Sequence, residues 1–324
     1  MRAIVCRRYG GPQVMQIEEV PRPEPAEGEV LIQSEAIGVN FVDTMRRSGR
    51  HPAPPPVPFT PGIEVCGRVV AVGAGVTRFR PGERVIGRCI THGSYAEFVV
   101  TEERFTVPCP ETLSAEEAAA LFVNGQTACH ALITVGQVRS GESVLVTAAA
   151  GGVGSCAVQI AKALGARVIA TASTDEKRRL AESLGADMVV DYTRENWPEL
   201  VLAATGGRGA DLILDSVGGA TARASLNCWA PGGRVVIYGK ASGEPLTVTS
   251  DQLLFGNRTA YGLAVGTVIE NEEVMRAAMQ RLEEWIATGA LRLLIGKRYP
   301  LADAAQAHRN LEGRTTHGKL VLLP

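Results

Sequence analysis

The sequence predicts an α/β protein of two domains, a small β-rich unit and a doubly wound parallel sheet. Three observations support this prediction. The chain has 324 residues, more than the roughly 100 to 200 residues of one typical domain. Proline and glycine break residues 1–111 into short segments. From Ser143 onward, by contrast, apolar strands alternate with helices.

In the β-rich part, proline-rich runs such as residues 52–56 separate the apolar segments. Apolar and β-branched residues favour strands at residues 1–5, 30–32, 65–72 and 95–100. Short strands bounded by turn residues are typical of a loop-rich all-β unit.

The second part begins with alanine-rich helices and continues as an alternation. We expect helices at residues 115–121, 127–135, 175–184 and 221–229, and strands at 143–148, 167–171, 188–191, 211–215 and 234–238. A further helix follows the first of these strands. Its apolar face contains Ala157, Ile160, Ala161 and Leu164, and Gly165 supplies its C-cap. Near-continuous apolar strands separated by helices imply a parallel sheet that is covered on both faces.

Three later elements have no place in this alternation: helices at 271–288 and 301–311, and a strand at 319–323. We therefore expect this part of the chain to return to the first domain. The predicted division is residues 1–122 with 265–324 for one domain and residues 123–264 for the other.

Composition argues against several kinds of partner. A formal net charge of -1 and an aromatic content of 5% provide neither a basic surface nor stacking platforms for nucleic acid. No stretch approaches the roughly 18 apolar residues of a membrane span. The seven cysteines are scattered without a C-x-x-C pair, as expected of reduced, packed thiols in a cytoplasmic protein.

A glycine turn is the strongest local signal. Residues 144–155 read VLVTAAAGGVGS, a strand followed by small residues and then a helix. Residues without bulk let the backbone approach a pyrophosphate, and the helix N-terminus supplies free N–H groups and positive potential. The turn departs from G-x-G-x-x-G because three alanines precede the glycines. The alternative is a tight turn that binds nothing.

Other motifs lie along the whole chain: GVNFVD at 38–43, PGIE at 61–64, FRPGERV at 79–85, GSYAE at 93–97, DSVGG at 215–219, GGR at 232–234 and GKLV at 318–321. With the glycine turn, they resemble the zinc-independent, zeta-crystallin-like quinone oxidoreductases of the medium-chain dehydrogenase/reductase superfamily. The resemblance implies a GroES-like substrate domain and a Rossmann domain, with the active site in the cleft between them. It also implies a homodimer joined through the Rossmann domains.

The resemblance implies that no metal is bound. Zinc enzymes of this superfamily have cysteine at the position of Asn40 and histidine at the position of Ile63, and catalytic zinc normally takes three protein ligands. Only His51 lies near the expected active site, and its alternative role is that of a solvated loop residue. Quinones and enones already accept hydride without a metal that stabilises an alkoxide.

Site residues are carried over from the resemblance position by position. Asn40 is expected at the nicotinamide ribose, and it is the one catalytic candidate, with a positioning role. Thr127 is expected beside the nicotinamide, and Gly151, Gly152 and Val153 around the pyrophosphate. Further expected contacts are Ser216, Tyr238, Gly239, Leu263 and Arg314. Structural alternatives remain open: Asn40 in a turn, Thr127 as a helix cap and Arg314 in solvent.

The expected cofactor is NADPH rather than NADH. NAD-selective sites place an acid about 20 residues beyond the glycine turn, and residues 171–174 read TAST. Ser173, Lys177 and Tyr192 instead match the positions that hold the 2′-phosphate in relatives. The alternatives are a capping box of Ser173 with Glu176 and a solvated helix face at residues 177–179. Asp175 is expected to serve the helix N-terminus.

The resulting prediction is metal-free reduction of quinones by NADPH. The runner-up is an enoyl-thioester or alkenal reductase, and the non-enzymatic alternative is an NADP-binding redox sensor, RNA-binding protein or structural protein. Residues 45–51 carry Arg46, Arg47, Arg50 and His51. They indicate either an anionic acceptor or a solvated basic face.

Overall fold

The computed structural model describes all residues from Met1 to Pro324 and forms two compact units. Unit 1 contains Met1–Val123 and Leu293–Pro324, and unit 2 contains Asn124–Arg292. The α/β class and the pairing of a β-rich unit with a doubly wound sheet are confirmed.

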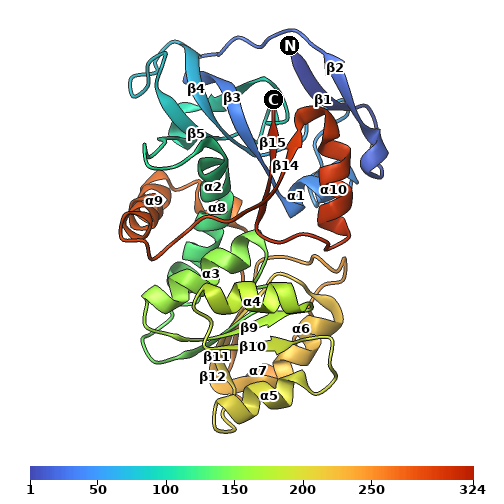
Figure 1. Ribbon diagram of the computed structural model, residues 1–324, viewed down its shortest axis with the longest axis vertical. Helices are drawn as coiled ribbons and strands as arrows, with labels where there is room; N and C mark the ends of the chain where they lie inside the picture. The colour runs from blue at the N-terminus through green and yellow to red at the C-terminus, as the bar shows by residue number, and fades with distance from the viewer. The chain divides into compact units, whose positions relative to one another are not determined.

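Unit 1 is built around a seven-stranded sheet of order β14-β15-β3-β4-β5-β7, with β6 paired to β3 (Figure 1). A separate pair, β1 (Arg2–Cys6) with β2 (Met15–Glu19), completes the strands. The sheet strands are β3 (Glu29–Val39), β4 (Glu64–Val72), β5 (Arg84–Arg88), β6 (Phe98–Glu102), β7 (Thr106–Pro108), β14 (Ile295–Pro300) and β15 (Lys319–Leu323). Alternating apolar residues of these strands form one core that includes Ile32, Val65 and Leu320.

Residues far apart in the chain meet in unit 1. The strand β15 runs antiparallel to β3, with Leu320 opposite Val39. Helix α1 (Phe41–Arg47) packs against α10 (Ala304–Glu312), and Figure 1 shows the red C-terminal elements beside the blue N-terminal ones. The last helix and strand therefore belong to unit 1.

Unit 2 contains a six-stranded parallel sheet of order β10-β9-β8-β11-β12-β13. Its strands are β8 (Ser143–Val146), β9 (Arg167–Ala172), β10 (Met188–Asp191), β11 (Ala210–Asp215), β12 (Trp229–Ile237) and β13 (Thr259–Gly262). The chain runs outward from β8 to β10 and then continues at β11 on the other side of β8. Ligands bind at the carboxyl ends of strands where the order reverses in this way.

Seven α-helices follow the first strand of unit 2. They are α3 (Gly152–Ala163), α4 (Asp175–Ser183), α5 (Trp197–Ala204), α6 (Gly219–Ser225), α7 (Ser250–Leu254), α8 (Val265–Val268) and α9 (Glu272–Ala287). Helices α3 and α4 pack on β8, β9 and β10. Trp197 and Val201 of α5 form a core with Leu145 and Ile169 of the sheet. Apolar strands therefore have apolar partners, as their uninterrupted hydrophobicity requires.

The two helices expected at 115–121 and 127–135 are one continuous segment. Helix α2 (Ala115–Cys129) passes directly into a π-helical turn at His130–Val135. The division failed because residues 122–126 include a glycine, whereas the buried Gln126 is hydrogen-bonded to the Met275 carbonyl and to His130 within a continuous helix. An 18-residue window within residues 115–135 has a mean hydropathy of 1.3, but 78% of that window is buried within the protein, as in a core helix.

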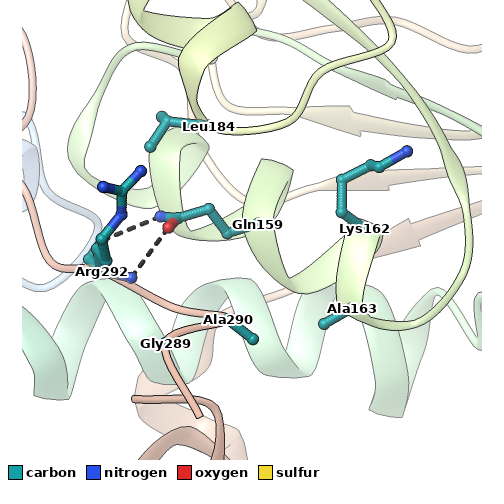
Figure 2. A pocket seen from close by; sticks show the side chains of 7 residues that line it. All are labelled: Gln159, Lys162, Ala163, Leu184, Gly289, Ala290 and Arg292. Carbon is teal, nitrogen blue, oxygen red and sulfur yellow. Dashed lines mark hydrogen bonds between the residues drawn. The ribbon is translucent and has the colours of Figure 1, made fainter. Parts of the chain in front are cut away.

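The second domain boundary differs from the expected one. Residues 265–292 belong to unit 2 rather than unit 1. Gln159 of α3 explains the difference, because its amide donates to the Arg292 carbonyl at 3.0 Å and accepts from the Arg292 N–H at 2.9 Å (Figure 2). Gln126 likewise donates to the Met275 carbonyl at 2.9 Å. These long-range bonds attach α9 and the segment after it to unit 2.

Candidate active site

The glycine turn joins β8 to α3 in the way that anion binding requires. The turn begins at Ala148, which has a φ of 49°, a left-handed conformation that is uncommon outside glycine. The Gly151 N–H donates to the Ala148 carbonyl at 2.9 Å. Gly151 caps α3 without any side-chain hydrogen bond. The first N–H groups of α3 therefore lack a side-chain acceptor, and a bound phosphate satisfies such groups.

Two glycines of this turn are required by close packing. A Cβ atom at Gly152 would lie 2.5 Å from the amide nitrogen of Asn124, and one at Gly154 would lie 2.2 Å from the Ala148 carbonyl oxygen. The Gly154 contact is with main chain and cannot be relieved, whereas the Asn124 side chain can shift. The expected residues Gly151, Gly152 and Val153 lie at the N-terminus of α3.

The expected contacts after the later strands share one edge of the sheet. Ser216 follows β11, Tyr238 and Gly239 follow β12, and Leu263 follows β13. Hydrogen bonds link these loops, since the Tyr238 N–H donates to the Asp215 carbonyl and the Leu263 N–H to the Ile237 carbonyl. The buried carboxylate of Asp215 accepts from the N–H groups of Val217 and Gly218, which orders the loop that carries Ser216.

The residues expected at the 2′-phosphate follow β9 and β10. Ser173 is the first residue after β9, Lys177 lies in the first turn of α4, and Tyr192 follows β10. Thr174, not Ser173, caps α4, and its hydroxyl accepts from the Lys177 N–H at 3.3 Å. The capping-box alternative for Ser173 is therefore wrong. Asp175 is the first residue of α4 and pairs with Arg178.

Thr127 lies inside α2 rather than at its end, so it does not cap the helix. It is 5% exposed and comes one helical turn after Asn124, whose amide approaches Gly152. Within unit 2 the structure therefore brings the expected residues to the glycine turn and the neighbouring strand ends. Asn40 and Arg314 belong to unit 1. Arg314 is exposed and follows α10, with a left-handed φ of 55°.

Asn40 is buried between two charges. It caps α1 directly after β3, and its side chain is 6% exposed. Its Nδ2 donates to Glu64 Oε1 at 2.8 Å, and its Oδ1 accepts from Lys319 Nζ at 2.7 Å. Lys319 also forms an ion pair with Glu64. Asn40 therefore serves the turn between β3 and α1, as the structural alternative proposed, and its side chain also lies between two buried charged groups.

Next to Asn40 lies a second polar group made of Asp43, Tyr95 and His308. Asp43 Oδ2 accepts from the Asn40 N–H at 2.8 Å and from the Tyr95 hydroxyl at 3.1 Å. Tyr95 also contacts His308 Nε2 at 2.9 Å. Burial raises the pKa of Asp43 to about 7 against the hydrogen bond from Asn40, and it lowers the pKa of His308 to about 3.

The basic residues of α1 require a correction. Arg47 is neither solvated nor available to bind an anionic substrate, because it is 2% exposed and pairs with Glu312 at 2.8 Å. The Arg47 side chain lies between α1 and α10. The sequence alone, with three arginines close together, does not show which of them is buried. Arg46 donates to the Ile90 carbonyl at 3.0 Å, and Arg50 is exposed. His51 contacts the main chain of Ala53, consistent with a local loop role.

Sequence reasoning assigned no role to Glu64, Lys319, Asp43, Tyr95 or His308. A signal for two of them existed. Glu64 begins the apolar strand EVCGRVVAV, and Lys319 begins the apolar strand KLVLL. A single charge at the end of a buried strand requires a partner, but sequence does not tell which one.

The donors around Asn40 do not suit zinc. An ammonium group already contacts Asn40 and Glu64, and Ile63 offers no donor atom. No group of three His, Cys, Asp or Glu side chains is arranged to hold a metal ion in residues 1–324. All seven cysteines are buried and form no disulfide. A surface hollow of about 470 Å³ beside Gln159 contains none of the expected site residues.

Comparisons with known proteins agree with this geometry. Residues 26–111 match the family model of the alcohol dehydrogenase GroES-like domain, and residues 152–284 match that of the zinc-binding dehydrogenases. A quinone oxidoreductase of Pseudomonas aeruginosa is 41% identical, over 98% of this chain and 97% of that protein. A 2-haloacrylate reductase of a Burkholderia species is 36% identical, over 99% of this chain and 98% of that protein.

A solved structure gives the same result over the entire chain. The quinone oxidoreductase of Escherichia coli, complexed with NADPH, superposes with a TM-score of 0.95 at 35% identity and covers 100% of both chains. Sequence and fold therefore agree over the full length of both proteins. The chain belongs to the zeta-crystallin-like quinone oxidoreductase family of the medium-chain dehydrogenase/reductase superfamily.

Proposed function

We propose that this protein is an NADPH-dependent oxidoreductase that reduces quinones or related electron-poor acceptors by hydride transfer without a metal. The observation that carries the proposal is the uncapped glycine turn of α3 at the carboxyl edge of the parallel sheet. The 41% identical quinone oxidoreductase and the NADPH complex of the E. coli relative support the same cofactor and reaction.

The proposed cofactor contacts are those that the family resemblance implies, at the positions described above. The N–H groups and small residues at Gly151, Gly152 and Val153 hold the pyrophosphate. Thr127 and Asn40 orient the nicotinamide and its ribose. Other contacts come from Ser216, Tyr238, Gly239, Leu263 and Arg314. When bound, NADPH supplies the hydride, and the protein contributes binding, orientation and exclusion of water.

NADPH is preferred because the end of β9 carries no carboxylate. Ser173 and Thr174 follow that strand, and Lys177 supplies a positive charge one turn further on. A 2′-phosphate gains a charge-assisted hydrogen bond there, whereas NADH has no group to use it. Asp175 is occupied by its ion pair with Arg178.

A metal-free reaction fits the residues near Asn40. The cation at this place is the ammonium of Lys319, bonded to Asn40 and paired with Glu64. Quinones and activated alkenes accept a hydride because electron-withdrawing carbonyls stabilise the product anion, so a Lewis acid is not essential.

The second candidate is reduction of activated alkenes, including halogenated acrylates. It is favoured by the 2-haloacrylate reductase, which is 36% identical and aligns over nearly the whole chain. Both acceptors place an electron-poor carbon against the same hydride donor. The distinction therefore depends on the acceptor pocket and not on the cofactor site.

We further propose a cytoplasmic homodimer joined through the β13 edge of unit 2. β13 is the last strand of its sheet and has one unpaired edge. Apolar side chains are exposed nearby, with Leu254 68%, Phe255 83% and Tyr261 39% exposed. An open edge with apolar neighbours favours pairing with a second copy. Sedimentation of the parent and of Phe255→Asp tests this, and a monomeric parent would contradict it.

The reaction is tested by following NADPH oxidation against a panel of quinones, alkenals, 2-haloacrylates and enoyl-CoA esters. We expect turnover with quinones, no loss of rate after dialysis against a chelator, and no stoichiometric zinc by elemental analysis. Turnover with alkenes alone would support the second candidate. Bound NADPH without turnover of any acceptor would favour a sensor or structural role.

A further inference from the structure

The side-chain amide of Asn40 has two partners whose hydrogen-bonding capacities are fixed. Lys319 is 2% exposed, and its ammonium lies 2.7 Å from Asn40 Oδ1. Glu64 is fully buried, and its carboxylate lies 2.8 Å from Asn40 Nδ2. An ammonium only donates hydrogen bonds and an ionised carboxylate only accepts them.

These partners permit one orientation of the amide. If the amide turned over, its NH2 group would face the ammonium and its oxygen would face the carboxylate. Both hydrogen bonds would be lost among buried side chains, which is the costly case for polar groups. An asparagine that lacks such partners has a broad, nearly two-fold torsion at χ2 and populates both orientations.

The sheet explains why these three residues meet. Strand β3 lies between β4 and β15 and is antiparallel to both, so the end of β3 adjoins the first residues of β4 and β15. Those first residues are Glu64 and Lys319, and Asn40 directly follows β3. Gly38 makes room for the carboxylate, because a Cβ atom there would lie 2.3 Å from Glu64 Oε1.

Further bonds hold the partners themselves. The second carboxylate oxygen of Glu64 accepts from the Val123 N–H at 2.9 Å. Asp43 accepts from the main-chain N–H of Asn40 at 2.8 Å. The backbone of Asn40 and the carboxylate that orients its side chain are thus fixed separately.

We infer that Lys319 and Glu64 are positioning residues that set the orientation of the Asn40 amide toward the cofactor. The inference rests on the proposed function, in which Asn40 contacts the nicotinamide ribose. The Asn40 oxygen faces Lys319 and the N-terminus of α1, and one N–H faces Glu64, so the amide retains its second N–H in a fixed direction. A ribose hydroxyl oxygen can accept from this N–H.

The first test replaces Lys319 by glutamine, which donates and accepts and therefore permits both amide orientations. We expect Lys319→Gln to lower kcat/KM for NADPH about tenfold and to weaken NADPH binding to a similar extent. About tenfold corresponds to 1.4 kcal/mol, a typical contribution of one hydrogen bond. The matched control is Arg298→Gln in the adjacent strand β14. Arg298 is exposed, pairs with half-buried Glu116 and does not contact Asn40.

A charge-balanced variant separates positioning from folding. Lys319→Gln leaves Glu64 buried without its cation and can reduce stability. Glu64→Gln combined with Lys319→Met removes both charges at similar volume, so no uncompensated charge remains. In this variant the new amide is free to donate to Asn40 Oδ1 and to reverse the Asn40 amide. We expect a thermal midpoint near that of Arg298→Gln but the same roughly tenfold loss in kcat/KM.

The decisive measurement is a double-mutant cycle with Asn40→Ala. If Lys319 acts through Asn40, adding Lys319→Gln or the charge-balanced pair to Asn40→Ala should change kcat/KM and NADPH affinity by less than about twofold. Losses that simply add would indicate a structural role and would overturn the inference, as would parent-like kinetics in the folded charge-balanced variant.

The cycle of NADPH dissociation constants decides the positioning role even without an acceptor. A parent that binds NADPH but reduces nothing would refute the proposed reaction, and a non-additive cycle of affinities would still support the inference. Failure of the proposed function and failure of the inference are therefore distinguished by different measurements.

Discussion

The glycine turn and the Asn40 cluster achieve a fixed geometry by different means. The turn is made of contiguous residues, and its shape comes from the backbone of Ala148 to Gly154. Asn40 is instead held by side chains that lie 24 and 279 positions away along the chain. The first depends on absence of side-chain bulk, and the second depends on paired buried charges.

This difference determines how each region should respond to substitution. A change at Gly152, whose close neighbour is a side chain, is expected to interfere with the ligand while leaving the packing of the sheet intact. A change in the cluster affects both stability and site geometry, because removing one member of a buried ion pair leaves the other uncompensated. The two regions are therefore separable by measuring ligand affinity and unfolding in the same variants.

The largest effect is expected from a substitution in the glycine turn. Gly152→Val should weaken NADPH binding more than about a hundredfold, because its side chain would occupy the pyrophosphate surface and press on Asn124. Calorimetry measures the affinity, and Gly152→Ala should show a smaller loss. Far-UV circular dichroism should remain that of the parent. Unchanged affinity in the valine variant would mean that the turn is only structural.

A smaller effect is expected near the glycine turn, where a substitution of Lys177 should distinguish NADPH from NADH. Lys177→Ala should weaken NADPH roughly ten- to a hundredfold through loss of a charge-assisted bond of about 1.5 to 3 kcal/mol, and should change NADH by a factor of a few. Arg179→Ala, on an exposed position of the same helix, is the control. Kinetic constants for both cofactors provide the measurement. Equal losses for NADPH and NADH would contradict the assignment.

The third effect concerns the Asn40 cluster, where Asp43 makes the stability of the protein depend on pH. Folding raises the pKa of Asp43 from 3.8 to about 7, so the folded state retains a proton that the unfolded chain releases. Its contribution to stability is fully present below about pH 4 and is lost as the pH rises through 7. Asp43→Asn removes this dependence. The stability of the variant relative to the parent should therefore increase by roughly 2 kcal/mol between about pH 5 and about pH 7.

Denaturant titrations at several pH values check this prediction. His308 acts in the opposite direction: its pKa is lowered in the folded state, so its contribution to stability increases as the pH rises. The parent and the variant share this contribution, so it cancels in their difference. Lys319, Arg46 and Tyr95 also face Asp43 and are likewise unchanged. A difference between variant and parent that stays flat with pH would show that Asp43 remains ionised in the fold.

The same contrast explains what sequence could predict. The parallel sheet, the turn and the strand that precedes Ser216 follow from local patterns, and the structure contains them. The strand that precedes Leu263, Thr259–Gly262, was not expected. The boundary at residue 292 could not be predicted, because it depends on hydrogen bonds of Gln159 and Gln126 across the chain. Lys319 and Glu64 appeared within recognisable motifs, but only the antiparallel register of three strands reveals their common partner.

The discontinuous make-up of unit 1 also has a consequence for biosynthesis. Unit 2 is contiguous from Asn124 to Arg292, so all its strands have left the ribosome before Lys319 is synthesised. Domains generally fold as units during synthesis, in the order of their completion. The nascent chain is therefore expected to form the dinucleotide-binding fold first. Asn40, although made early, waits for β15 before its amide acquires a defined orientation.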